Sequence, residues 1–322
     1  MSVYPWILDN LKVTKLTILK PSDKTIVGIR ILSVALNLPG PAALMRLADM
    51  GAKCTKLEPL SPAGIVKGTS TDPMGMYAPH AYAQLHRGVK VLQADLKTDK
   101  GQVQLHKLLA QTDVLLTSFR PSALKKLGLS WADLHDKFPA LNMVSIVGSA
   151  GAGAEIPGHD LTYLAAHDLV TGLNLPATLF ADMAGSLQAS EAVLKVLWQR
   201  GKPGRSHGKG VFHEVALEGA AAYLALPRQW GLTTPKGSVG GAHAGYAVYL
   251  CKNGRVAVAA LEPHFAARLA QVAGLPSGKP EQNIMLLPKT KTHLTAFFAT
   301  LTRKQVDAMA LANDLPLHTM AL

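Results

Sequence analysis

The chain has 322 residues, of which 48% are hydrophobic and 17% charged, values typical of a globular protein with a large core and not of a disordered one. Its 33 basic residues exceed its 21 acidic residues and give a formal charge of +12, which suits an anionic partner such as a nucleotide or coenzyme A. The basic residues are scattered, without the interleaved aromatic residues of RNA-binding proteins, so nucleic acid is not the expected partner.

The two cysteines, Cys54 and Cys251, are far apart and lack CxxC spacing, so they indicate a reducing compartment more than a disulfide framework. No apolar run approaches the length of a membrane span, and residues 1–27 lack the cleavage site of a signal peptide. No HExxH motif or cluster of His and Cys predicts a bound metal. We therefore expect a soluble, cytoplasmic protein without a metal or redox cofactor.

After a lysine-rich extension (1–27), short apolar segments alternate with helical ones. Strands are predicted at 28–36, 53–57, 90–94, 113–119 and 141–147, and helices at 41–50, 100–110, 161–170 and 183–198. This alternation indicates βαβ units and a large Rossmann-like α/β domain, with a mostly parallel sheet flanked by helices. Neither GxGxxG nor GxxxxGK[ST] is present, so nucleotide binding through those loops is not expected. Ligands of such sheets usually lie beyond the carboxyl ends of the strands.

The predicted helix at 183–198 carries a spacing of large apolar residues that predicts its buried face. Leu187, Leu194, Leu197 and Trp198 fall on one stripe. From about 181 to 226 the chain is predicted to be largely helical, interrupted by a basic, glycine-rich loop at 201–210.

After Pro227 the sequence changes in texture, which places a domain boundary near residue 226 and predicts a small α+β domain at 227–322. Two apolar runs, 246–250 and 256–261, flank Asn253-Gly254, a dipeptide that is typical of a β-hairpin turn. Helices are predicted at 263–272, 293–301 and 304–312. The large domain is accordingly expected at 28–226.

Titratable groups stand beside small residues at two predicted helix starts. Gly158-His159-Asp160 precedes the helix at 161–170, and Asp182 precedes the helix at 183–198. Free N–H groups and the helix dipole favour negative charge at such positions. One His and two Asp at helix starts predict an acid/base site, with a structural histidine and a plain helix cap as the alternatives for His159 and Asp182.

Blocks of sequence elsewhere in the chain resemble a known family when they are taken in order. They are Gly28-Ile-Arg-Ile-Leu32, Pro39-Gly-Pro41, Leu47-Ala-Asp-Met-Gly-Ala52, Leu85-His-Arg-Gly-Val-Lys90, Asp113-Val-Leu-Leu-Thr-Ser-Phe-Arg-Pro121 and Leu127-Gly-Leu129. The run resembles the class III CoA-transferase family. Gly158-His-Asp160, Ala181-Asp-Met-Ala-Gly185 and Leu261-Glu-Pro-His-Phe265 are further similar to the motifs of its α-methylacyl-CoA racemases.

The resemblance implies an acyl-CoA racemase or epimerase that inverts the α-carbon of a 2-methyl-branched thioester in lipid metabolism. Inversion needs one group on each face of the α-carbon and a stabilised enolate oxygen. By resemblance, His159 and Asp182 form this pair and Glu262 orients His159. N–H groups at the helix start near Asp160 are then expected to receive the enolate oxygen. Glu262-Pro263 could instead simply begin a helix.

The resemblance also implies a coenzyme A site and a homodimer. The expected CoA-binding residues are Arg87, Lys90, Phe119, Arg120, Lys126 and Gly148. Pro59 stands where family members often have an arginine that contacts CoA, and the chain ends at Leu322, without the family's segment that returns to the large domain. Because that segment helps to interlock two chains, an interlocked dimer is in question.

Two other functions stay open from the sequence. A class III CoA-transferase would use the carboxylate of Asp160 as its nucleophile, forming an acyl anhydride and then an enzyme thioester. A catalytically degenerate relative would bind CoA and do no chemistry. Hydroxylamine sensitivity during turnover would mark the transferase, and CoA binding without exchange or transfer would mark the degenerate protein.

Overall fold

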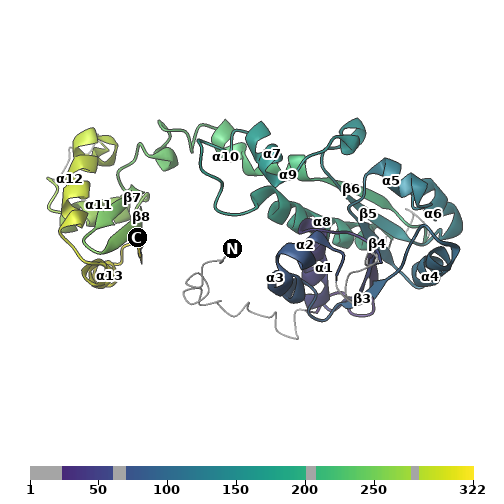
Figure 1. Cartoon of the computed structure of the whole chain (residues 1–322). Helices are drawn as coiled ribbons and strands as arrows, with labels where there is room; N and C mark the ends of the chain where they lie inside the picture. Colours follow the sequence, from purple (N-terminus) through teal and green to yellow (C-terminus); the bar gives the residue numbers. More distant parts are fainter. Residues whose placement is uncertain (1–23, 61–69, 201–207, 277–282) are drawn as a thin grey trace, which may run out of the picture. The chain divides into compact units, whose positions relative to one another are not determined.

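The computed structural model describes residues 24–60, 70–200, 208–276 and 283–322 (Figure 1). The chain divides into two compact units, Met1–Leu224 and Ala225–Leu322, where the sequence analysis places the boundary after residue 226. Most of the predicted extension and the loop at 201–207 lie outside the described residues.

The first unit is built on a parallel sheet of six strands in the order β3-β2-β1-β4-β5-β6. The strands are β1 (Arg30–Ser33), β2 (Lys53–Glu58), β3 (Lys90–Gln93), β4 (Val114–Thr117), β5 (Asn142–Val147) and β6 (Phe212–Ala216). The strand order reverses direction between β1 and β4, and ligands of doubly wound sheets bind at this point. The predicted α/β fold class, with its parallel sheet and flanking helices, is confirmed.

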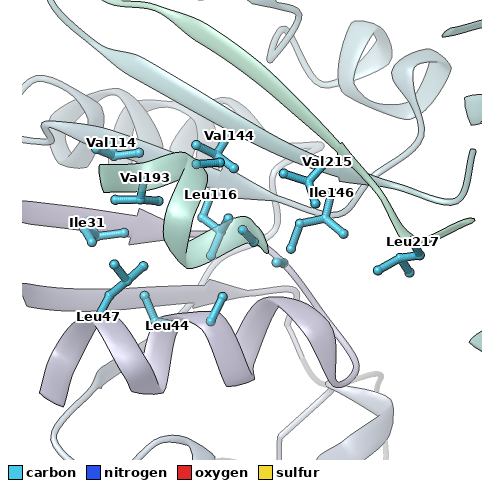
Figure 2. Close-up of a cluster of buried hydrophobic side chains, with 14 of the residues drawn as sticks. Ile31, Leu44, Leu47, Val114, Leu116, Val144, Ile146, Val193, Val215 and Leu217 are labelled. Atoms are coloured by element: carbon cyan, nitrogen blue, oxygen red, sulfur yellow. The ribbon is translucent and has the colours of Figure 1, made fainter. Parts of the chain in front are cut away.

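Helices cover both faces of this sheet because alternate strand residues point to opposite sides. The unit's helices are α1 (Pro39–Asp49), α2 (Pro73–Tyr77), α3 (Pro79–Leu85), α4 (Asp99–Leu109), α5 (Pro121–Lys126), α6 (Trp131–Lys137), η3 (Gly151–Glu155), α7 (Asp160–Ala166), α8 (Phe180–Arg200) and α9 (Leu217–Leu224). Figure 2 shows one face, where Ile31, Leu116 and Ile146 of the sheet meet Leu44 of α1 and Val193 of α8. Leu32 and Leu115, one residue along their strands, face α4, α5 and α6 on the other side.

The predicted apolar stripe of α8 is wrong in part, since Leu194 and Leu197 are half-buried, and Leu197 packs on the core. Leu187 and Trp198 are exposed, whereas the buried positions of the helix are mostly glycine, alanine, serine and valine, such as Gly185, Ala189 and Val193. Small residues let α8 approach its neighbours closely, and a Cβ at Gly185 would collide with the side chain of Leu217. The helix therefore packs by close approach and not by a leucine ridge.

The prediction that the chain is largely helical from 181 to 226 is also wrong in part, because β6 is a strand. It pairs with β5 alone, with Met143 opposite Phe212 and Val147 opposite Ala216. A short edge strand with His213 and Glu214 in its middle lacks the continuous apolar run by which a buried strand is recognised.

The second unit is a three-stranded antiparallel sheet, β7-β8-β9, with helices packed on it. Its elements are α10 (Leu226–Gln229), η4 (Ser238–Gly240), β7 (Tyr246–Cys251), β8 (Gly254–Ala259), α11 (Pro263–Val272), η5 (Ile284–Leu286), α12 (Pro288–Ala299), α13 (Arg303–Ala312) and β9 (Leu317–Met320). The predicted hairpin is present, but Cys251 pairs with Gly254, so Lys252 and Asn253 form its loop. The strand β9 was not predicted.

Among the described residues, no helix combines the length and apolarity that a membrane crossing requires.

Candidate active site

A cavity of about 250 Å³ lies at the carboxyl ends of β1, β4 and β5, beside the reversal of strand order. Loops after these strands, the first turn of α7 and the start of α8 and α9 form its wall. The lining residues are Leu36, Asn37, Pro39, Ser118, Phe119, Arg120, Ile146, Val147, Gly148, Ala154, Ile156, Pro157, Gly158, His159, Tyr163, Asp182 and Leu217. The ligand position expected for a doubly wound sheet and this cavity coincide.

His159 is the residue immediately before α7, in extended backbone conformation. Its N–H donates to the hydroxyl of Thr162 over 3.0 Å, and its carbonyl accepts from the N–H of Thr162 over 2.8 Å. This reciprocal cap fixes the backbone, while the imidazole is exposed and lines the cavity. The local sequence thus holds His159 where a ligand can reach it.

Asp160 and Asp182 are adjacent but face different surroundings. Asp160 is the first residue of α7 and only 4% exposed, and its Oδ1 accepts the N–H of Asp182 over 3.0 Å. Asp182 is the third residue of α8, so the Asp160 carboxylate caps that helix and neutralises part of its N-terminal dipole. Asp182 lines the cavity, whereas Asp160 is not among the lining residues.

The position of Asp182 alters its acidity. Burial, and after it the negative charge of Asp160, raise the pKa of Asp182 to about 6. A carboxyl group with this pKa can both donate and accept a proton near neutral pH. Of the two aspartates, Asp182 is therefore the one suited to acid/base chemistry.

Tyr163 shapes the wall between these groups and was not singled out from the sequence. Its ring occupies the space that a Cβ at Gly148 or Gly158 would need, so both positions require glycine. Burial and the negative charge of Asp182 raise the pKa of Tyr163, which keeps its hydroxyl protonated. The spacing Gly158 to Tyr163, with an aromatic residue in the first turn of a helix, is the only sequence feature that could have identified it.

The expected CoA-binding residues fall into two groups. Phe119, Arg120 and Gly148 line the cavity. Arg87, Lys90 and Lys126 are exposed and lie outside its lining. Arg87 precedes the edge strand β3, Lys90 is the first residue of that strand, and Lys126 is the last residue of α5.

Glu262 belongs to the second unit, as the exposed residue before α11, and Pro263 begins that helix as the sequence indicates. Its predicted contact with His159 lies between the two units and stays a prediction. Within the described ranges, no three His, Cys, Asp or Glu side chains gather as metal ligands.

Similarity to known proteins identifies the family to which the chain belongs. The sequence profile of CoA-transferase family III matches residues 26–321. The chain is 28% identical to the α-methylacyl-CoA racemase of Mus musculus over 297 residues, which are 86% of this chain and 73% of the racemase. It is also 34% identical to the cinnamoyl-CoA:phenyllactate CoA-transferase of Clostridium sporogenes over 158 residues, 45% of this chain and 36% of that enzyme.

Solved structures share the fold. A CaiB/BaiF family protein from Brucella suis superposes with a TM-score of 0.73 at 21% identity, covering 93% of this chain and 85% of that one. A hypothetical protein from Mycobacterium tuberculosis gives a TM-score of 0.74 at 23% identity, covering 93% of this chain and 84% of that one. The profile match over nearly the whole described chain, on this fold, shows that the protein belongs to CoA-transferase family III.

Proposed function

We propose that the protein is an acyl-CoA racemase or epimerase that inverts the α-carbon of a 2-methyl-branched acyl-CoA thioester. The observation that carries the proposal is that His159 and Asp182 line one cavity, whereas Asp160 is buried beside it. Two acid/base groups in one cavity are what inversion by proton transfer requires. Asp160, the nucleophile of a transferase, is instead occupied in capping α8.

The proposed reaction moves only a proton. One of His159 and Asp182 removes the α-proton, the electron pair delocalises onto the thioester oxygen, and the other group returns a proton to the opposite face. N–H groups at the start of α7 receive the enolate oxygen. Glu262 orients His159, either within the chain or from a partner chain in a homodimer. Coenzyme A takes part only as the carrier of the acyl group.

The α-carbon test is direct. Racemic and single-enantiomer 2-methylacyl-CoA esters are incubated with the protein in D2O, and α-deuterium is measured by NMR. We expect deuterium incorporation together with inversion. A hydroxylamine-sensitive intermediate and CoA transfer to a free acid, without α-exchange, would establish the transferase. Binding without either reaction would establish a degenerate CoA-binding protein.

We predict that Arg120→Ala weakens acyl-CoA binding. Arg120 follows β4 at its carboxyl end and lines the cavity, so its guanidinium can meet a phosphate of CoA. Loss of one hydrogen bond to a charged group should cost roughly 1.5–3 kcal/mol in binding, measured by calorimetry. Lys107→Ala is the matched control, because Lys107 is exposed in the last turn of α4. This helix runs antiparallel to the strands that it connects, so its last turn lies toward their amino ends, whereas the cavity lies at their carboxyl ends. Equal affinities for the Arg120 variant and the wild type would refute the assignment.

A further prediction concerns the pH dependence of Asp160→Asn. For the enantiomer from which Asp182 removes the proton, kcat/KM depends on the carboxylate form and falls as pH drops through the pKa of about 6. Asparagine keeps an acceptor for the Asp182 N–H but removes the negative charge that helps to raise this pKa. We therefore expect inversion to persist and its acidic limb to move to lower pH.

The measurement is kcat/KM for inversion as a function of pH, for both proteins. An unmoved acidic limb would contradict the electrostatic link between the two aspartates. A folded Asp160→Asn protein without any activity would contradict the racemase proposal itself and favour the transferase.

A further inference from the structure

The turn after β1 places Asn37 in the cavity in an unusual backbone conformation. Its φ is +65°, in the left-handed region, which among residues other than glycine is adopted mainly by asparagine and aspartate. Asp168 and Asp314 are the other non-glycine residues with positive φ in the described part of the chain, and neither lines the cavity. Such conformations cost free energy and persist where surrounding contacts enforce them, frequently at functional sites.

Two side chains from distant parts of the sequence enforce the turn. Asp72 Oδ1 accepts the N–H of Asn37 over 3.1 Å, and Ser118 Oγ accepts the N–H of Leu36 over 3.0 Å. The same Oδ1 of Asp72 also accepts the N–H of Met74 over 2.9 Å and so caps the N-terminus of α2. The turn at Asn37 is thereby held by residues that follow β2 and β4, the two strands on either side of β1.

Asp72 is itself fixed by a buried cluster around Lys56. The Lys56 Nζ contacts Asp72 Oδ2, lies 3.1 Å from Glu58 Oε1 and 3.0 Å from His86 Nε2, so all three ammonium protons have acceptors. Lys56 and Asp72 are fully buried, and Glu58 is 1% exposed. Burial and the Lys56 charge lower the pKa of His86, which is therefore neutral and donates through Nδ1 to the Tyr82 carbonyl over 2.7 Å.

Burying several charged groups costs free energy of desolvation, so this cluster suggests that the position of the loop at Asn37 is important. Buried charges add little net stability compared with apolar residues of the same volume. Here the Asp72 carboxylate, held by Lys56, determines where the Asn37 N–H lies. Asn37 is one of the residues that line the cavity, and its carboxamide makes no hydrogen bond to another residue in the part of the chain that the structure describes.

We infer that Asn37 contacts the substrate, donating from its carboxamide to the thioester oxygen, and that Asp72 is its positioning residue. The inference rests on the proposed function in taking an acyl-CoA thioester as the ligand. His159 and Asp182 line the same cavity and must face the α-carbon, which is bonded to the thioester carbonyl carbon. A carboxamide donor on this wall suits that oxygen, whereas the phosphates of CoA suit the basic residues such as Arg120.

The first test uses two ligands that differ by one oxygen. Isobutyryl-CoA carries the thioester carbonyl, and S-isobutyl-CoA, a thioether, has a methylene in its place. Asn37→Gly removes the carboxamide and tolerates the left-handed backbone. By calorimetry we expect this variant to bind isobutyryl-CoA about tenfold more weakly than the wild type and S-isobutyl-CoA equally well. Equal effects on both ligands, or no effect, would overturn the role of Asn37.

The second test separates positioning from general stability. Asp72→Ala removes the acceptor of the Asn37 N–H and should weaken ester binding by several fold in the wild type, but add nothing in the Asn37→Gly background. Leu134→Ala is the control for general stability, because Leu134 is fully buried in the core under α4, α5 and α6 and belongs to neither the cavity lining nor the Lys56 cluster, and it should leave the ester-to-thioether ratio unchanged. An equal loss from Asp72→Ala in both backgrounds would mean that the cluster serves stability alone.

Failure of the proposed role of Asn37 and failure of the racemase proposal give different results. If Asp72→Ala does not fold, Ser118→Ala, which removes the acceptor of the adjacent Leu36 N–H, replaces it in the same double-variant comparison. Both tests measure binding, not turnover. A wild type that binds the ester in an Asn37-dependent way but exchanges no α-proton would therefore overturn the racemase proposal and support the role of Asn37.

Discussion

His159→Ala and Asp182→Ala should each lower the rate of inversion of a 2-methylacyl-CoA ester by about 10²–10⁴-fold, the usual contribution of a positioned acid or base. Both side chains line the cavity, and inversion needs a proton donor on the face opposite to the base. With either group missing, one face has no donor. The rates of inversion are measured with single enantiomers by chiral analysis of the released acids.

Exchange of the α-proton should survive in part. The remaining group can still remove a proton and return one to its own face, provided that the enolate is stabilised. Since His159 and Asp182 serve opposite faces, the residual deuterium uptake should favour opposite enantiomers in the two variants. Glu191→Ala is the control, because Glu191 is exposed on the same helix as Asp182 and pairs only with Lys195 at the surface in the described structure. Residual exchange with the same enantiomer in both variants would refute the two-base assignment.

The sequence predicted the sheet of the first unit well because its strands are short apolar runs between clear turn residues. β2 and β3 begin at the predicted residues, Lys53 and Lys90. β6 was not predicted because it pairs with β5, which is far away in the sequence, and because its own polar segment has no local strand pattern. The buried face of α8 was misjudged because size was taken as a guide to burial, whereas the close neighbours α1 and α9 favour small residues there.

Site residues could be predicted from the sequence only where they belong to motifs that follow one another in the order of the family. His159 and Asp182 were identified by resemblance, and the structure places them on one cavity. Asn37 and Tyr163 were missed, since their importance depends on the packing of the loops around them. The cluster around Lys56 was equally hidden, because its carboxylate and imidazole partners, Asp72 and His86, come from separate segments. No local pattern reports that such residues meet.

Lys56→Met should strongly destabilise the protein. Methionine is close to lysine in shape but leaves Glu58 and Asp72, both buried, without the ammonium that faces them. Removing one partner of a buried ion pair typically costs about 3–5 kcal/mol, because the remaining charge is buried and unpaired. Urea unfolding followed by circular dichroism measures the loss. Lys195→Met is the matched control, since its surface pair with Glu191 should contribute below about 1 kcal/mol.

The pH dependence of this loss distinguishes buried charge from simple misfit. In the wild type, burial alone would raise the pKa of Glu58, but the Tyr82 hydroxyl and the Lys56 ammonium outweigh burial and lower it. A depressed folded-state pKa stabilises the protein above the unfolded pKa, and this stability is lost as pH falls through the folded value. In Lys56→Met the ammonium is absent, so burial should raise the pKa of Glu58. As pH falls, protonation of Glu58 then removes the buried unpaired charge and stabilises the variant, while the wild type loses the stability that came from its depressed Glu58 pKa. The gap in unfolding free energy should therefore narrow as pH falls from neutral toward about 4. A gap that stays constant over this range would mean that the loss comes from packing and not from unpaired carboxylates.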